Sequence, residues 1–326
     1  MIELRHDALE ISFPELHRDA RLRIDFQRTL RLPDDGREYP LPAGLGRFPL
    51  RHVDDFADRL PEAWRRHGGV LLPMYQAEAM WLNFRSPAGY PFAVKIAAGK
   101  INAASGETWR EGLHRDPQDY CAVPGQPWLD GFCVAKGVVR QFVAAPLGMG
   151  ATAEEQLTGE AEHGGLQILA HPLKAKIWRR EKRLVFAERA ESPLVEACAT
   201  PVAMGLAPGG RMRQEIYADP RDLADWDQRV RARCFVHLAS SLTWKSITGE
   251  LPPNRPLGAS SYAAAGIPWF DYYDAELKAL GGAAALAGLK STSEFEDLLP
   301  DDGEEAWVTP PIVLKDPRGR RSVREF

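Results

Sequence analysis

The densest group of polar side chains in the sequence lies in the segment 159–165, which contains Glu160, Glu162 and His163. Carboxylates and imidazoles are ligands that divalent transition metals accept. His171 follows eight residues after His163 and, on one strand, would lie roughly 26 Å away, too far for one ion. We therefore expect solvent-exposed loop acids and no bound cofactor, with a metal at Glu160, Glu162 and His163 as the alternative.

A second group of residues that can do chemistry occupies 114–120. His114 and Asp116 stand two residues apart, where a carboxylate can orient an imidazole for general acid–base catalysis. No nucleophile stands at a spacing that indicates a catalytic set, so an exposed loop leading into a strand is the expectation. If the protein is instead an enzyme, His114 and Asp116 are its catalytic candidates.

Aromatic side chains next to Pro, Gly or acidic residues form the third group. Such rings line ligand clefts and protein interfaces, although more of them pack in cores. Trp269 and Phe270 follow a Pro-rich loop and have the character of an anchor that pins one surface to another. The candidate binding or interface residues are Tyr75, Trp81, Trp128, Trp269, Phe270 and Tyr272.

Several function classes are disfavoured by composition and by missing motifs. The sequence has no GxGxxG after a strand, no Walker A, no GxSxG, no HExxH and no EF-hand loop. Its net charge of −4, from 41 basic and 45 acidic residues, argues against a nucleic-acid binder. It shows no secretory signal and no apolar run of the ~18 residues that a membrane span needs. A soluble, cytoplasmic protein is therefore expected.

The elements that must position these side chains are predicted to be mainly strands. The 326 residues include 26 Pro, 28 Gly and 9 Trp, and 44 % of them are hydrophobic, which fits short strands, ordered loops and a sizeable core. Residues 20–32 alternate, with Leu22, Ile24 and Phe26 on one face, as in a half-buried strand. We expect an α+β fold: an antiparallel β sandwich or barrel-like body with a helix-containing C-terminal part.

Local patterns refine this expectation. A helix over 55–66, capped by Asp54 or Asp55, is followed by a bent strand over 70–84. Residues 119–147 predict a β-meander with turns at 124–125 and 136–137. The remaining expected elements are two short strands in 91–107, a short helix or turn in 151–160, a strand at 165–174, a strand leading into a capped helix from 210, and a strand or helix over 231–248.

The domain division and the cysteines are less informative. A composition shift divides a β-rich body, 1–175, from a mixed α/β part, 176–326, although one interlocked domain fits equally well. The second part ends in an extended tail with an acidic and then a basic run. The four cysteines are expected to be reduced thiols, with a Cys121–Cys133 disulfide as the alternative.

Six stretches of the chain carry a resemblance to other proteins: LLPMYQAEAMWLNF, PFAVKIAAGKINAASGE, QDYCAVPGQPWLDG, VRQFVAAPLG, EEQLTGEAEHGGLQI and GIPWFDYYD. Together they resemble a group of uncharacterised bacterial and fungal proteins, some of which are labelled "integral membrane protein". The resemblance covers residues 45–275 and implies no catalytic residue, and the membrane label conflicts with the hydropathy of this chain.

These observations favour a non-catalytic structural or binding protein that self-assembles or docks a protein partner. The missing catalytic motifs, the Trp/Pro loops and the two-signed tail carry this expectation. The alternatives are a metal-assisted hydrolase or oxygenase, and a carbohydrate- or peptide-binding module that uses Trp128 and Trp269.

Overall fold

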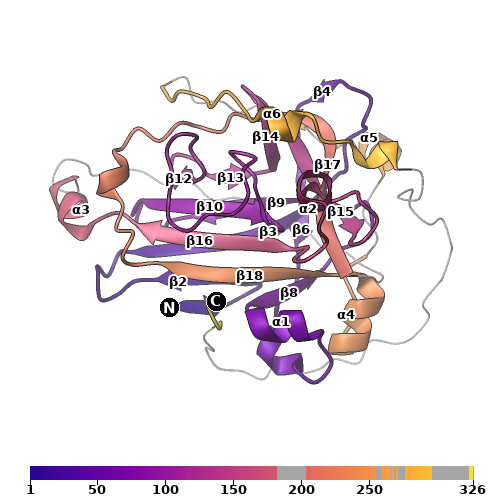
Figure 1. The fold of residues 1–326 in the computed structure, drawn as a ribbon, viewed down its shortest axis with the longest axis horizontal. Helices are drawn as coiled ribbons and strands as arrows, with labels where there is room; N and C mark the ends of the chain where they lie inside the picture. The colour runs from indigo at the N-terminus through magenta and orange to yellow at the C-terminus, as the bar shows by residue number, and fades with distance from the viewer. Residues whose placement is uncertain are drawn as a thin grey trace.

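The fold is mostly antiparallel β-sheet with short helices, which confirms the predicted α+β class. It is known from a computed structural model (Figure 1). The model describes residues 1–181, 203–254, 258–264, 266–267, 269–270, 276–295 and 323–325. Tyr272 and nearly all of the predicted two-signed tail lie outside the described residues.

Seventeen of the described strands belong to one sheet. These are β1 (Ile2–Leu4), β2 (Ala8–Ser12), β3 (Arg21–Thr29), β4 (Glu38–Tyr39), β6 (Gly44–Arg47), β7 (Arg51–His52), β8 (Val70–Pro73), β9 (Ala79–Arg85), β10 (Phe92–Ala98), β11 (Ile101–Asn102), β12 (Cys121–Val123), β13 (Trp128–Leu129), β14 (Gly131–Ala135), β15 (Val138–Pro146), β16 (Leu166–Pro172), β17 (Ala203–Arg213) and β18 (Ala232–Ala239). A separate pair consists of β5 (Leu41–Pro42) and β19 (Trp269–Phe270).

The described helices are short. They are α1 (Glu62–His67), α2 (Ala153–Thr158), α3 (Ala175–Glu181), α4 (Ser241–Thr248), α5 (Ala259–Ala264) and α6 (Ala284–Ala287), with 3-10 turns at Val53–Phe56, Leu223–Asp225 and Thr292–Glu294. Within the described ranges, none of these helices has the length and apolarity needed to cross a membrane.

The large sheet curves until its two ends share one core. Neighbouring strands follow the order β1, β2, β3, β9, β15, β17, β18, β16 and β10. Figure 1 shows β10, β16 and β18 as a row of neighbours. Ile24 and Phe26 of β3 belong to the same buried cluster as Val94 of β10 and Ile168 of β16. The apolar face predicted for residues 20–32 is therefore confirmed and lines this core, but the expected half-buried strand is wrong, because Asp25, Gln27 and Thr29 on the opposite face are buried as well.

The predicted helix over 55–66 is wrong in extent. The chain makes a 3-10 turn at Val53–Phe56, and α1 begins only at Glu62. Pro61 stands between them as the N-cap, and a proline ring cannot supply the N–H that a continuous helix would need there. The predicted cap is also wrong, because neither Asp54 nor Asp55 caps a helix.

The predicted β-meander over 119–147 is also corrected. β12 pairs with β10, whereas β13 pairs with β9, so the turn at 124–127 carries the chain from one part of the curved sheet to another. Only β14 and β15 form the expected hairpin. The reason is burial: Val123 lies opposite Phe92 and Leu129 lies opposite Leu82, and these pairs come from opposite sides of the core.

Strands on both sides of residue 175 complete this sheet. β17 pairs with β15 and β18 pairs with β16, so the boundary drawn near 175 falls inside the sheet. Residues 231–248, for which strand and helix were both expected, form β18 and then α4. The capped helix expected after 220 is only the 3-10 turn Leu223–Asp225.

The three described cysteines, Cys121, Cys133 and Cys234, are buried free thiols.

Candidate functional site

A buried lysine on β10 organises the most polar region of the protein. Lys95 is 1 % exposed, and its Nζ donates to the carbonyls of Arg110 at 2.6 Å and Gly112 at 2.9 Å and to Asp119 Oδ2 at 2.6 Å. The ring of Trp109 lies 5.1 Å from the same ammonium. All three donors of the ammonium thus have an acceptor, and they tie the loop 103–120 onto the outer face of the sheet.

This loop contains a tight turn with an acid–base pair at its base. Arg115 and Gln118 form an isolated bridge on either side of the Asp116–Pro117 peptide, which is cis. His114 and Asp119 follow next to this bridge, at the base of the turn. His114 Nδ1 lies 2.8 Å from Asp119 Oδ2, and the His114 N–H donates to Asp119 Oδ1 at 2.9 Å. The structure therefore pairs His114 with Asp119, while Asp116 lies at the tip of the turn.

Asn102 connects this turn to the neighbouring wall. Its Oδ1 accepts from the N–H groups of Ala104 and Ser105, both at 2.9 Å, and its Nδ2 donates to the Asp119 carbonyl at 2.7 Å. Asn102 is 1 % exposed, so these bonds are shielded from water. One buried amide therefore sets Ala104 and Ser105 relative to the turn.

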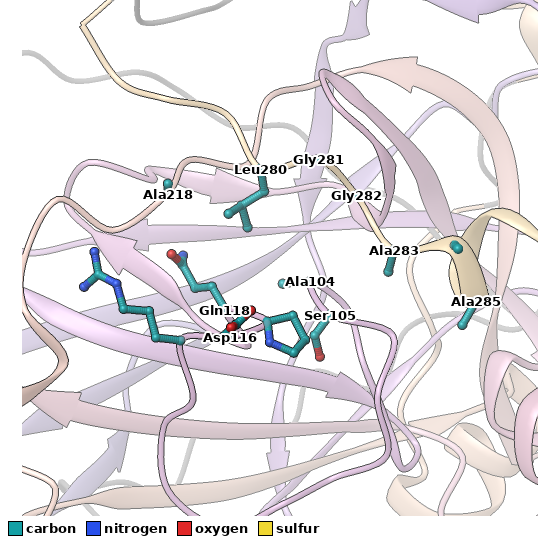
Figure 2. A pocket seen from close by; sticks show the side chains of 13 residues that line it. Ala104, Ser105, Asp116, Gln118, Ala218, Leu280, Gly281, Gly282, Ala283 and Ala285 are labelled. Carbon is teal, nitrogen blue, oxygen red and sulfur yellow. The ribbon is translucent and has the colours of Figure 1, made fainter.

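A pocket of about 420 Å³ opens between this turn and the segment that leads into α6 (Figure 2). Hydrogen bonds from the Ala283 N–H to the Cys133 carbonyl at 2.8 Å and from the Leu280 N–H to the Ile216 carbonyl at 2.7 Å hold the far wall. The pocket is lined by Ala104, Ser105, Arg115, Asp116, Pro117, Gln118, Ala218 and residues 280–285. Its size falls in the usual range for small-molecule sites, about 300–1,000 Å³.

Most polar side chains in this pocket are already engaged. The Gln118 amide donates to the carbonyls of Tyr120 and Tyr217 and accepts from the Asp219 N–H. Arg115 donates to main-chain carbonyls at 219 and 221. Asp116 is exposed, and across the described part of the chain its carboxylate has no hydrogen bond or ion pair. This carboxylate is therefore the group that a ligand can meet.

The acidic group at 160–163 has a different environment from the pocket. Lys100 forms ion pairs with both Glu160 and Glu162, and these bonds raise the pKa of the lysine and lower that of Glu162. The ring of His163 lies against His67, at 5.2 Å, and its Nε2 atom is 3.9 Å from Glu162 Oε1. Among the described residues, no group of three or more His, Cys, Asp or Glu side chains has an arrangement that holds a metal ion.

The predicted aromatic residues fall into two separate groups. Trp81 and Trp128 lie on neighbouring strands, since Trp128 is opposite Asn83 in the β13–β9 register, and both rings are half-buried. Tyr75, also half-buried, belongs to the turn between β8 and β9, where its N–H donates to Glu78 Oε2 at 2.9 Å. The other group, Trp269 and Phe270 on β19, is 40 % and 49 % exposed.

Trp128 has a role that its sequence context did not indicate. Its indole is hydrogen bonded to Asp130, which lowers the pKa of that carboxyl, but burial dominates and raises the pKa to about 7. The Oδ2 atom of Asp130 is buried without a hydrogen-bond partner in the described structure. Trp128 therefore contacts a buried carboxyl.

Sequence reasoning missed Lys95, Asn102 and Asp119. Lys95 had a visible signal, since a lone lysine interrupts the apolar run PFAVKIAA, and a charge in a buried strand needs a partner. Asn102 and Asp119 have ordinary loop contexts, and only the folded loop shows what they bind.

The fold and the site together define a β-rich protein with a small polar pocket beside a loop-covered sheet. A scan of protein-family models finds no match to the chain, and searches of curated proteins and of solved structures find none either. The resemblance to bacterial and fungal proteins stays a prediction.

Proposed function

We propose that the protein is a non-catalytic binding protein that holds a small amine-bearing molecule in the pocket next to Asp116. The observation that carries this proposal is the free carboxylate of Asp116 in a wall made otherwise of small side chains and engaged polar groups. An ammonium group of a ligand can form a charge-assisted hydrogen bond with such a carboxylate, which would orient the ligand in the pocket.

The neighbouring arginine does not occupy the Asp116 carboxylate. Arg115 also lines the pocket, but its guanidinium is bonded to the Asp219 carbonyl at 2.9 Å and to the Arg221 carbonyl. It forms no ion pair with Asp116 among the described contacts. The alanine and glycine residues of the 281–285 wall leave space for the short apolar body of a ligand.

Isothermal titration with a panel of small primary amines, and with neutral and anionic analogues of equal size, tests the proposal. We expect amines to bind and Asp116→Asn to weaken their binding by about two- to fivefold, as for loss of an exposed ion pair. Asp222→Asn, which changes another exposed carboxylate outside the pocket lining, is the matched control. Absence of binding by every analogue, or equal amine binding by Asp116→Asn, would show that the proposal is wrong.

A second candidate function, self-association, is favoured by Trp269 and Phe270. These two adjacent large rings are 40 % and 49 % exposed, and β19 pairs only with β5 in the described structure, so a second copy of the chain could cover them. The proposed occupant is a second copy of the chain. Light scattering should show a dimer at micromolar concentration that Trp269→Ser with Phe270→Ser converts to monomer, and a monomeric wild type contradicts it. The hydrolase or oxygenase alternative and the carbohydrate- or peptide-binding alternative stay predictions.

A further inference from the structure

Three histidines that are distant in sequence meet on the outer face of the sheet, and we call them the histidine cluster: His67, His163 and His237. His67 ends α1, and its ring stacks on Phe235 of β18 at 4.4 Å and 12°. The same ring meets His163 edge-on at 5.2 Å. His237 of β18 stacks on Trp64 of α1 at 4.7 Å and 23°. Imidazole rings therefore make much of the contact between α1 and β18.

The C-terminal end of α1 is bonded to the same strand. His237 Nε2 lies 2.9 Å from the carbonyl of Gly68, the residue that caps α1, so a neutral imidazole with its proton on Nε2 donates there. At Gly69 a Cβ atom would stand 2.1 Å from the Phe235 carbonyl oxygen, so the backbones are in close contact. Anything that disfavours the His237 contact therefore acts directly on the docking of α1.

Burial lowers the pKa of each histidine in the histidine cluster. His237 is 2 % exposed, and burial lowers its pKa to about 3, helped by the charges that His67 and His163 would carry. Burial is also the largest cause of the lowered pKa values of His67 and His163. Each of the three imidazoles is thus easier to protonate when α1 has moved away.

The charged groups around the histidine cluster do not cancel this effect. Glu162 favours protonation of His67 and His163, and its Oε1 atom lies 3.9 Å from His163 Nε2, but Glu162 and Glu160 are both paired with Lys100. Arg233 opposes protonation of both. The facing charges are Arg66 of α1, Arg233 of β18, Lys100 after β10, Glu154 of α2, Glu160 and Glu162 of the loop before β16, and Arg324 against Gly68.

We propose that the histidine cluster is a pH-sensitive switch that holds α1 on β18 near neutral pH and releases α1 in acid. Release exposes His237 and separates His67 from His163, so the opened form takes up protons that the closed form excludes. The proposal concerns α1 and is independent of the ligand pocket.

The direction and size of the effect follow from proton linkage. For a histidine whose pKa is lowered on docking, the docked form keeps its full stability above the ordinary pKa of 6.5. That stability falls progressively as the pH drops below 6.5. For His237, with a docked pKa of about 3, opening is favoured roughly 30-fold more at pH 5 than at neutral pH. His67 and His163 add to this factor in the same direction.

Hydrogen exchange of the full chain, followed by mass spectrometry and corrected for the intrinsic rate, measures the opening. We expect exchange in the peptide 62–72 to rise by about 30-fold or more between pH 7 and pH 5, because opening binds protons. The peptide 92–98, which covers β10, should keep its protection over the same range. Equal protection of 62–72 at the two pH values would overturn the proposal.

Variants separate the effect of histidine titration from the effect of packing. The readout is the exchange rate of the peptide 62–72 at pH 5 divided by its rate at pH 7, and a change in packing alone affects both rates. His237→Gln retains a donor for the Gly68 carbonyl but does not titrate. We therefore expect the increase in exchange between pH 7 and pH 5 to be about 30-fold smaller in this variant than in the wild type. His6→Asn, a change in an exposed turn far from β18 in sequence, should leave the ratio unchanged. A wild-type ratio in His237→Gln would overturn the proposal. If His237→Gln does not fold, the wild-type pH titration decides, and a rise in opening clearly smaller than about 30-fold between pH 7 and pH 5 contradicts the switch.

Discussion

Lys95 and Asp119 form an ion pair of 2.6 Å in which the side chains are only 1 % and 3 % exposed. Lys95 comes from the sheet, and Asp119 comes from the loop that carries the turn at 115–118. Two buried charges of opposite sign thus anchor one wall of the pocket. Because neither charge can be rehydrated without moving the loop, the position of Asp116 depends on this pair.

The substitution Asp119→Asn should be strongly destabilising. It leaves the Lys95 ammonium buried without a counter-charge, for which a cost of about 3–5 kcal/mol in the free energy of unfolding is typical. Urea denaturation measures it, and Glu160→Gln is the matched control because Glu160 is 59 % exposed beside Lys100. We expect that control to cost less than about 1 kcal/mol. Similar costs for the two variants would show that the buried pair does not anchor the loop.

Asp130 should make stability depend on pH in the sense opposite to most carboxylates. Burial raises its pKa from 3.8 to about 7, so its stabilising contribution is complete below the unfolded value and is lost as the pH rises through the folded one. The wild type should lose up to about 4 kcal/mol between pH 4 and pH 8 relative to Asp130→Asn. Urea denaturation of both proteins at the two pH values gives this difference, and parallel pH profiles would contradict it.

Gly69 should tolerate no side chain. Its φ is +83°, and a Cβ atom there would stand 2.1 Å from the Phe235 carbonyl oxygen. Gly150 has a similar φ of +73° but nothing within 4 Å, so Gly150→Ala isolates the backbone strain of about 1–2 kcal/mol. We expect Gly69→Ala to lose its folding transition in thermal denaturation and Gly150→Ala to keep one. Equal melting temperatures would refute the close contact between Gly69 and β18.

Gly281 offers a way to fill the pocket without disturbing the fold. It lines the pocket, and a Cβ atom there meets nothing within 4 Å. Gly281→Leu should change the free energy of unfolding by no more than about 0.5 kcal/mol while weakening amine binding by about tenfold or more. Gly258→Leu, at another open glycine outside the lining, is the control for titration and urea denaturation. Undiminished amine binding by Gly281→Leu would place the ligand elsewhere.

Periodicity along the chain was enough to predict several elements. Alternating Leu22, Ile24 and Phe26 identify β3 and its buried face, because successive side chains of a strand point to opposite sides. The strand predicted at 165–174 is present as β16, and the segment 151–160, for which a short helix or a turn was expected, contains the helix α2. These predictions depend only on residues within one segment.

The partners of the polar side chains were decided by the tertiary structure. His114 pairs with Asp119 rather than Asp116 because the chain reverses at 116–117 and brings residues on either side of the turn together. Glu160 and Glu162 meet Lys100, a residue some sixty positions earlier, and His163 meets His67. The sequence by itself determined which faces of its strands are apolar, since that is a property of each segment. Which charges and rings become neighbours depends on how distant strands pair and bury their apolar faces together, and that is settled only when the whole sheet closes around its core.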